Sequence, residues 1–179
     1  QVDQLFVLVI DASASMNSID GSDSMNRMEK VRKALLMPSV GDAFFPEGAN
    51  NRVVIFTFTD GQPRPLGGQL KMLETPEAYR KLIRSSLRPS SGYTHLYDAV
   101  RFGTIDLLKD KKVREWLELR EAAPTIVVLT DGFNNEKPGD VCGDNAPRLQ
   151  RLLEDIYAAR FDEGIDIRVR PSVYTVGLG

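Results

Sequence analysis

Residues 5–15 read Leu-Phe-Val-Leu-Val-Ile-Asp-Ala-Ser-Ala-Ser, an unbroken apolar run that stops at Asp11. A run without polar alternation is typical of a strand that is buried on both faces of a parallel sheet. The polar residues that follow therefore lie where a buried strand ends. In open α/β sheets, ligands bind at that edge, outside the carboxyl ends of the strands.

Further runs of the same kind follow along the chain at Arg52–Thr59, at Thr125–Thr130 and, in a shorter version, at Val173–Val176. Between the runs, apolar residues recur at helical spacing. These residues are Met28, Val31 and Leu35; Tyr79, Leu82 and Ile83; Leu96, Ala99, Val100, Gly103 and Leu107; and Leu149, Leu152, Leu153, Ile156 and Tyr157. Alternating strands and helices predict a doubly wound α/β fold, with a mostly parallel central sheet and helices on both faces.

Other segments have weaker patterns. Gln62–Leu73 is rich in turn residues, and one short antiparallel edge strand is expected within it, near Gln69–Leu73. Lys109–Ala122 is highly charged but has apolar residues at helical spacing, which predicts either an extension of the preceding helix or a small helix packed on the surface. Ile165, Ile167 and Val169 alternate with charged residues, as in a half-exposed strand. A chain of 179 residues with 42% hydrophobic content is the size of one domain, so residues 1–179 are expected to form a single unit.

The composition excludes several classes of function. The 23 basic and 25 acidic residues nearly cancel, so the basic excess of a nucleic-acid or anionic-membrane binder is missing. No apolar run approaches the roughly 18 to 20 residues of a membrane span, so no direct membrane insertion is expected. The only cysteine, Cys142, can form no internal disulfide, and we interpret it as inert.

Hydroxyl and carboxylate side chains follow two of the predicted strands and precede one predicted helix. Asp11, Ser13 and Ser15 follow the first strand, Asp131 follows the strand that ends at Thr130, and Thr94 lies before the helix that contains Leu96. Hard divalent cations such as Mg²⁺ prefer oxygen ligands and are usually held by one or two carboxylates. This set therefore predicts a cation site. The alternative is that the same residues only form turns and cap helices.

At this point the sequence resembles the von Willebrand factor A family, whose metal ion-dependent adhesion site reads Asp-x-Ser-x-Ser, then a distant Thr, then a distant Asp. The sequence matches at every motif position. The resemblance implies a Rossmann-like fold in which Ser13, Ser15 and, when a partner is bound, Thr94 contact the metal, while Asp11 and Asp131 act directly or through water. It also implies Mg²⁺, or alternatively Mn²⁺ or Ca²⁺, as the cofactor.

The resemblance extends to the stretch Val173–Gly179, which is similar to a late strand of the family and the turn after it. The last helix of the family is then expected beyond Gly179. Two positions depart from the family pattern, because Ala14 and Tyr93 stand where members often have glycine. We expect a partner-binding rim around the metal that consists of Tyr93, His95, Asp20 and Asp23.

Two residues near the motif could be mistaken for functional groups. His95 is the only histidine, and it lacks the positioned nucleophile that a general base needs, so we interpret it as a surface residue. Asp98 lies one helical turn after Thr94, where an acid is favoured by the helix dipole, and we interpret it as structural.

The leading hypothesis is a binding module, not an enzyme, in which the cation coordinates an Asp or Glu carboxylate of a protein partner. The first alternative is a Mg²⁺-dependent phosphohydrolase, but Ser13 stands where the haloacid dehalogenase type has a second aspartate, and no P-loop is present. The second alternative is a subunit that docks on an ATPase or transport machine. The residues do not fix the compartment, and an extracellular or cell-surface location is only slightly favoured over a cytoplasmic one.

Overall fold

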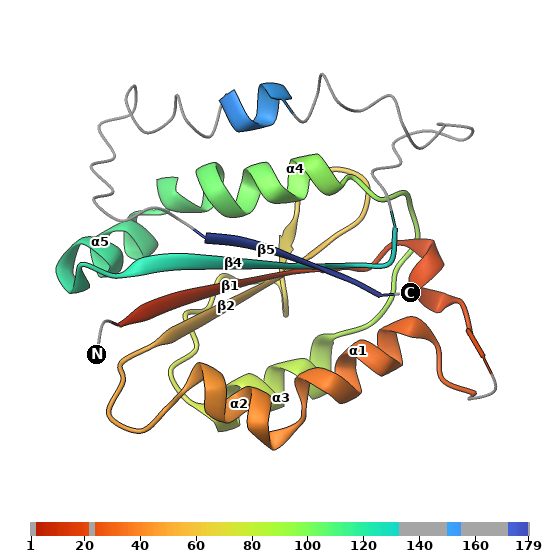
Figure 1. Ribbon diagram of the computed structural model, residues 1–179, viewed down its shortest axis with the longest axis horizontal. Coiled ribbons are helices and arrows are strands. Elements are labelled where there is room, and N and C mark those ends of the chain that lie inside the picture. Colours follow the sequence, from red (N-terminus) through yellow and green to blue (C-terminus); the bar gives the residue numbers. More distant parts are fainter. Residues whose placement is uncertain (1–2, 22–23, 133–149, 155–171, 179) are drawn as a thin grey trace.

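The computed structural model describes residues 3–21, 24–132, 150–154 and 172–178. Within these ranges the strands form one sheet in the order β3-β2-β1-β4-β5 (Figure 1). The strands are β1 (Gln4–Asp11), β2 (Arg52–Phe58), β3 (Arg64–Pro65), β4 (Ala123–Thr130) and β5 (Ser172–Gly177). The helices are α1 (Arg27–Leu35), α2 (Pro38–Phe44), α3 (Pro76–Ser86), α4 (Leu96–Arg101) and α5 (Lys111–Arg120).

The sheet confirms the predicted fold class. Strand β1 pairs in parallel with β2 and β4, and β5 pairs in parallel with β4. Strand β3 is the short antiparallel edge strand and pairs only with β2. Because β1, β2, β4 and β5 all run the same way, their carboxyl ends lie at one end of the molecule, which is the right-hand end in Figure 1.

The position predicted for the edge strand was wrong. The strand lies at Arg64–Pro65 instead of near Gln69–Leu73, where Leu73 alone forms an antiparallel bridge to Val53. The reason is a turn at Gly67 and Gly68, whose φ angles are +79° and +84°. Glycine adopts this left-handed conformation without steric cost, so the chain leaves the edge after Leu66 and returns to it only at Leu73.

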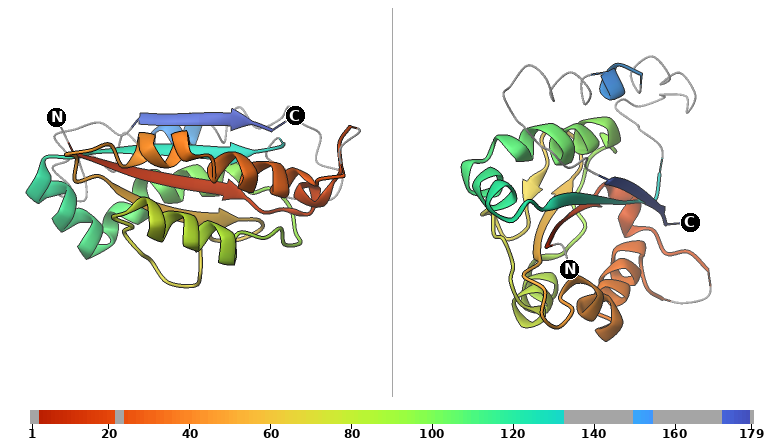
Figure 2. Two further views of the ribbon diagram at one scale, coloured as in Figure 1. Left: turned by 90° about the horizontal axis from the view of Figure 1, so that it is seen from below. Right: turned by 60° about the vertical axis from the view of Figure 1, so that its left-hand side comes forward.

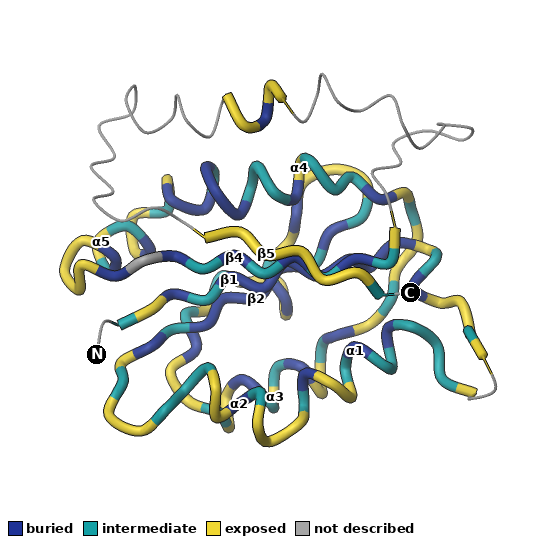
Figure 3. The backbone as a smooth tube through the Cα atoms, in the orientation of Figure 1, coloured by how far each residue is buried: buried dark blue, intermediate teal, exposed yellow. Residues whose placement is uncertain are grey.

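Alternate residues of β1 point to opposite faces of the sheet, and each face is covered by helices, as predicted. Val7 and Val9 lie in a cluster with residues of α4 and α5, whereas Leu8 and Ile10 lie in a second cluster with residues of α1 and α3. Figure 1 shows α4 and α5 on one side of the sheet and α1, α2 and α3 on the other. The burial colours of Figure 3 show why β1 has no polar alternation, since most of the strand is buried.

The helix that follows the Thr94 loop packs closely on the sheet. It begins as α4, continues through a π-helical turn at Phe102–Asp106 and ends in a 3-10 turn at Leu107–Lys109. Gly103 allows the approach, because a Cβ atom there would lie 3.2 Å from Cγ2 of Ile126 on β4. The helix predicted from Leu96, Ala99, Val100, Gly103 and Leu107 is therefore confirmed. Its packing against the sheet fixes the position of the loop that carries Thr94.

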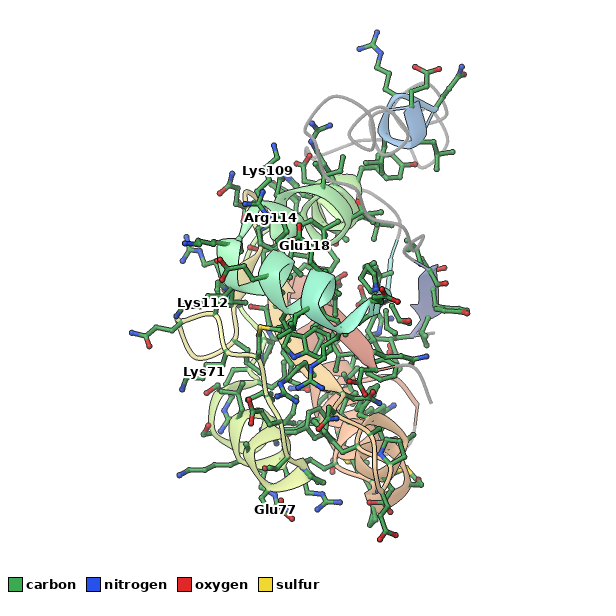
Figure 4. The ribbon with its side chains drawn as sticks, turned by 90° about the vertical axis from the view of Figure 1, so that its left-hand side faces the viewer. Lys71, Glu77, Lys109, Lys112, Arg114 and Glu118 are labelled. Atoms are coloured by element: carbon green, nitrogen blue, oxygen red, sulfur yellow. The ribbon has the colours of Figure 1, made fainter. Side chains whose placement is uncertain are left out.

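Of the two alternatives for Lys109–Ala122, the structure has the separate surface helix, α5, which buries Val113 and Leu117. Its N-cap is Asp110, whose side chain accepts hydrogen bonds from the backbone of Lys112 and Val113. Figure 4 looks onto the end of the molecule that carries α5, where labelled side chains of both charges, including Lys112 and Glu118, project from the surface. Figure 2 shows the sheet and its two helical layers from two further directions.

Several predictions fall on residues that the structure does not describe. These are the strand at Ile165–Val169, Cys142, Asp23 and the ends of the helix predicted around Leu149–Tyr157, of which 150–154 are helical. The expectation of a single domain over residues 1–179 stays a prediction. In the described ranges, no helix is both long and apolar enough to cross a membrane.

Candidate metal centre

Asp11 is the last residue of β1, and its carboxylate is fully buried. Oδ1 accepts a hydrogen bond of 2.8 Å from the backbone N–H of Ser13, and Oδ2 accepts one of 2.8 Å from the hydroxyl of Thr130 at the end of β4. Burial raises the pKa of Asp11 above its usual value, although the hydrogen bonds from Ser13 and Thr130 oppose the shift. The carboxylate is thus rigidly held in a place where a cation would stabilise its charge.

The hydroxyls of the motif form a continuous chain beside Asp11. Thr94 donates to Oγ of Ser13 at 3.2 Å, and the Oγ atoms of Ser13 and Ser15 are 3.0 Å apart. Ser15 donates to Oδ1 of Asp131 at 2.9 Å. The structure therefore brings together all the residues that the sequence predicted as metal ligands, from the loops after β1 and β4 and the loop before α4.

Backbone contacts hold these loops against one another. A 3-10 turn at Ala14–Asn17 follows Ser13, and the backbone N–H of Ala14 donates to the carbonyl of Gly92 at 3.2 Å. Gly92 has a φ of +111°, and a Cβ atom there would lie 2.2 Å from Oδ1 of Asp60. A side chain at position 92 would have to displace the Asp60 carboxylate and adopt a φ that is rare for residues other than glycine, so glycine suits the loop that carries Thr94.

Arg27, which the sequence analysis missed, belongs to the same site. It is the first residue of α1, and its Nη1 donates to Oδ2 of Asp131 at 2.6 Å. Its Nε and Nη2 contact the two carboxylate oxygens of Asp20, and this contact lowers the pKa of Asp20 below its usual value. In the ion pair between Arg27 and Asp131, the Asp131 side chain is only 1% exposed and is therefore shielded from water.

The residues predicted to form the rim have different environments. Tyr93 is 39% exposed beside Thr94. The Nδ1 atom of His95 accepts a hydrogen bond from the backbone N–H of Gly61 at 3.3 Å and lies 3.4 Å from Asp98. Asp20 is at the edge of the site but is paired with Arg27, and Asp23 lies outside the described residues.

Two details near Thr94 agree with the predictions. Helix α4 begins at Leu96 with His95 as its N-cap residue, so Thr94 lies before the helix, as predicted. Asp98 lies in the first turn of α4, where the helix dipole favours an acid, in agreement with the structural role expected for it.

The donor set fits a hard divalent cation. The carboxylates of Asp11 and Asp131 are both buried. The guanidinium of Arg27, which is partly exposed, pairs with Asp131. Buried charge is costly unless it is paired, and the hydroxyls of Ser13, Ser15 and Thr94 add the neutral oxygen ligands that Mg²⁺ accepts. Because only two carboxylates meet here, the site depends on its hydroxyls, and in the described ranges no group of three or more His, Cys, Asp or Glu side chains is placed to hold a metal.

The sequence was compared with models of known protein families, and the von Willebrand factor type A domain matches residues 6–134. The chain belongs to this family. The match starts within β1 and ends just after Asp131, so it covers every residue of the hydroxyl and carboxylate cluster. No curated protein matches the sequence of this von Willebrand factor A domain.

Solved structures share the fold at low sequence identity. An aerotolerance-related membrane protein from Bacteroides fragilis, with multiple mutations to serines, superposes with a TM-score of 0.58 at 17% identity, over 98% of this chain and 68% of that chain. A von Willebrand factor type A protein from Catenulispora acidiphila gives a TM-score of 0.57 at 16% identity, over 98% of this chain and 33% of that one.

Proximal thread matrix protein 1 from the mussel byssus, solved with zinc in its MIDAS motif, gives a TM-score of 0.57 at 18% identity, over 98% of this chain and 36% of that chain. This von Willebrand factor A domain thus spans about a third of the length of the Catenulispora and mussel proteins. At these identities the similarity establishes the fold.

Proposed function

We propose that this von Willebrand factor A domain is a metal-dependent protein-binding module. A divalent cation, Mg²⁺ in the first instance and Mn²⁺ or Ca²⁺ as alternatives, is held by Ser13, Ser15 and Thr94 together with Asp11 and Asp131. When bound, the cation supplies a coordination position for an Asp or Glu carboxylate of a partner protein. The domain's own residues hold the cation and orient the surrounding rim.

The observation that carries the proposal is the chain of side-chain contacts from Thr94 through Ser13 and Ser15 to Asp131, with no separation above 3.2 Å. Serine and threonine hydroxyls in a turn usually bond to nearby backbone groups. Here they instead contact one another across three loops, beside two buried carboxylates. An oxygen-rich cluster of this composition is suited to a hard cation.

The contacts of Asp11 favour binding over phosphoryl transfer. A phosphohydrolase of the kind considered above would use the first aspartate as a nucleophile, which must reach the substrate phosphorus. Both carboxylate oxygens of Asp11 are buried and accept hydrogen bonds, from Ser13 and Thr130. We therefore propose that the domain is not an enzyme. Docking on an ATPase or transport machine would use the same binding chemistry with a different partner.

Partner selectivity is proposed to come from the rim. A single carboxylate on a hydrated cation gives modest affinity, so side chains around it must discriminate between partners. Tyr93 is exposed next to Thr94 and offers an amphipathic ring to a partner surface. A cell-surface or extracellular setting would suit this use of the domain.

Calorimetric titration with Mg²⁺ and Mn²⁺ tests the proposal. We expect the wild-type domain to bind both ions, and D11A and D131A to lose the heat of binding. Asp42 of α2 provides a matched control, because it is 72% exposed and pairs only with Arg80 in the described structure; D42A should bind like the wild type. Binding that persists in D11A and D131A, or that is missing from the wild type, would contradict the proposal.

The partner chemistry has its own test, which uses a short peptide with a single Glu and a matched peptide with Gln in its place. In the presence of Mg²⁺ the Glu peptide should bind and the Gln peptide should not, and EDTA should abolish the difference. Equal binding of the two peptides would argue against carboxylate coordination.

A further inference from the structure

Arg27 is placed between two carboxylates that come from different parts of the chain. Its Nη1 atom contacts Oδ2 of Asp131 at 2.6 Å, and its Nη2 atom contacts Oδ1 of Asp20 at 3.1 Å. The Arg27 side chain is 25% exposed, whereas that of Asp20 is 43% exposed. The guanidinium therefore joins a buried carboxylate of the proposed cation site to a carboxylate that water reaches.

The two oxygens of Asp131 have separate partners. Oδ1 accepts from Ser15 and faces the hydroxyl chain, while Oδ2 accepts from Arg27. Arg27 thus approaches Asp131 from the side away from the hydroxyls and leaves the hydroxyl side to a ligand. Its effect on a cation would be through charge, because a fixed positive charge that neutralises Asp131 weakens the attraction of the same carboxylate for a second positive charge.

The position of Arg27 in α1 is unfavourable for the helix itself. A cation at the first position of a helix meets the positive end of the helix dipole, where acidic residues are preferred. The helix start is fixed by a capping box between Asn26 and Glu29, which does not involve the Arg27 side chain. The contacts with Asp131 and Asp20 are therefore what stabilise a guanidinium at this place.

We propose that Arg27 is an internal counter-cation that balances the buried charge of Asp131 and thereby lowers the affinity of the site for divalent cations. This inference rests on the proposed function, since it concerns the same site. Asp20 holds the guanidinium from the other side, and the backbone carbonyl of Asp20 also accepts from Nζ of Lys30 at 2.9 Å. Affinity for the cation is thus set by a residue outside the metal-binding motif.

The charge balance gives the direction of the effect. Arg27 is the cation that contacts Asp131, and it shares Asp20 with Lys30, whose charge also acts on that carboxylate. Removing the guanidinium leaves Asp131 without the positive charge that contacts it, so a cation at the site is attracted more strongly by that carboxylate. An arginine-to-methionine change keeps most of the apolar stem and removes the charge, so R27M should bind Mn²⁺ about tenfold more tightly than the wild type.

The test is calorimetric titration of Mn²⁺ into the wild type and four variants: D131N, R27M, R27K and K33M. Lys33 is exposed on the same helix, so K33M removes one positive charge at a distance from the site and controls for net charge. We expect R27M to bind about tenfold more tightly, and R27K, which retains the positive charge, to stay within about threefold of the wild type. K33M should stay within about twofold, because exposed charges far from the site are screened.

The opposite result would show that Arg27 acts by orienting Asp131. In that case both R27M and R27K would bind Mn²⁺ more weakly than K33M, and the inference would be overturned. Circular dichroism and melting temperatures without metal verify that each variant is folded. If R27M is too unstable to titrate, R27Q is titrated with the same expected gain, and a folded R27Q that binds no more tightly than K33M also overturns the inference.

Failure of this inference and failure of the proposed function are distinguishable. If the wild type binds Mn²⁺, D131N does not, and R27M shows no gain, the cation site stands and only the role of Arg27 is wrong. If neither the wild type nor R27M binds, both fail. If R27M alone binds Mn²⁺, and binding is lost in the double variant R27M/D131N, Arg27 opposes binding strongly enough to suppress it, which supports the inference.

Discussion

The hydroxyl of Thr130 donates a hydrogen bond of 2.8 Å to Oδ2 of Asp11, across 119 positions of the sequence. The bond joins the carboxyl ends of β4 and β1, which are adjacent strands of the sheet. It also places a neutral donor on a buried carboxylate and so opposes the rise in the pKa of Asp11 that burial causes. The pair is therefore a structural support of the proposed cation site.

Removing this donor should destabilise the domain. T130V keeps the shape of the side chain but leaves Oδ2 of Asp11 without a hydrogen bond in a buried environment. We expect a loss of about 1–3 kcal/mol in the free energy of unfolding, measured by urea denaturation without metal. T175V serves as the control, because Thr175 is exposed on β5 and should change stability by less than about 0.5 kcal/mol. Equal losses in the two variants would contradict this role for Thr130.

Neutralising Asp11 should separate stability from binding. Burial disfavours the ionised carboxylate, whereas the amide of D11N is neutral, can accept from Ser13 and can donate to Thr130. We expect the metal-free D11N variant to melt about 2–4 °C higher, which corresponds to about 1 kcal/mol for a chain of this size. D11A, which leaves Ser13 and Thr130 without their partner, should melt lower than the wild type. Mn²⁺ binding should be lost in both.

The raised pKa of Asp11 also predicts how cation binding depends on pH. A carboxylate must lose its proton to bind a metal, and a raised pKa means that the proton competes at a higher pH than for an ordinary aspartate. As the pH is lowered, Mn²⁺ affinity should therefore begin to fall at a higher pH than an aspartate with the ordinary pKa of about 3.9 would cause. An affinity that stays constant down to about pH 4.5, measured by calorimetry on folded protein, would contradict this expectation.

The sequence predicts the fold and the cluster for a common reason. Unbroken apolar runs mark strands that are buried on both faces, and parallel strands place their carboxyl ends at one edge of the sheet. Asp11 and Asp131 follow two such strands, so their proximity can be predicted from topology alone. The clustering of Thr94 with them depends on the motif, because no strand ends directly before it.

Arg27 and the edge strand could not be predicted for different physical reasons. The contact of Arg27 with Asp131 spans 104 positions, and a lone arginine at the start of an amphipathic helix has the same pattern as a solvated surface charge. Strand β3 consists of Arg64 and Pro65 only, too short for an alternating pattern to exist. The left-handed turn at Gly67 ends β3, and the antiparallel pairing with β2 determines where β3 lies.

The close approach of Gly92 to Asp60 leads to a last prediction. G92A places a methyl group where Oδ1 of Asp60 now lies, at a backbone φ of +111° that alanine rarely adopts. G68A provides the matched control, since Gly68 has a φ of +84° with no atom within 4 Å of the added Cβ. We expect G68A to cost about 1 kcal/mol from backbone strain alone and G92A at least about twice that.

A double-mutant cycle separates the steric clash from the strain. In G92A/D60A the side chain that meets the new methyl group is gone, so stability should recover to about the level of G68A. The clash should also disturb the loop that carries Thr94, because the carbonyl of Gly92 accepts from Ala14 within the proposed metal-binding motif. G92A should therefore weaken Mn²⁺ binding, and G92A/D60A should restore much of it. If the double variant is no more stable than G92A, the contact with Asp60 is not the reason that glycine is required at position 92.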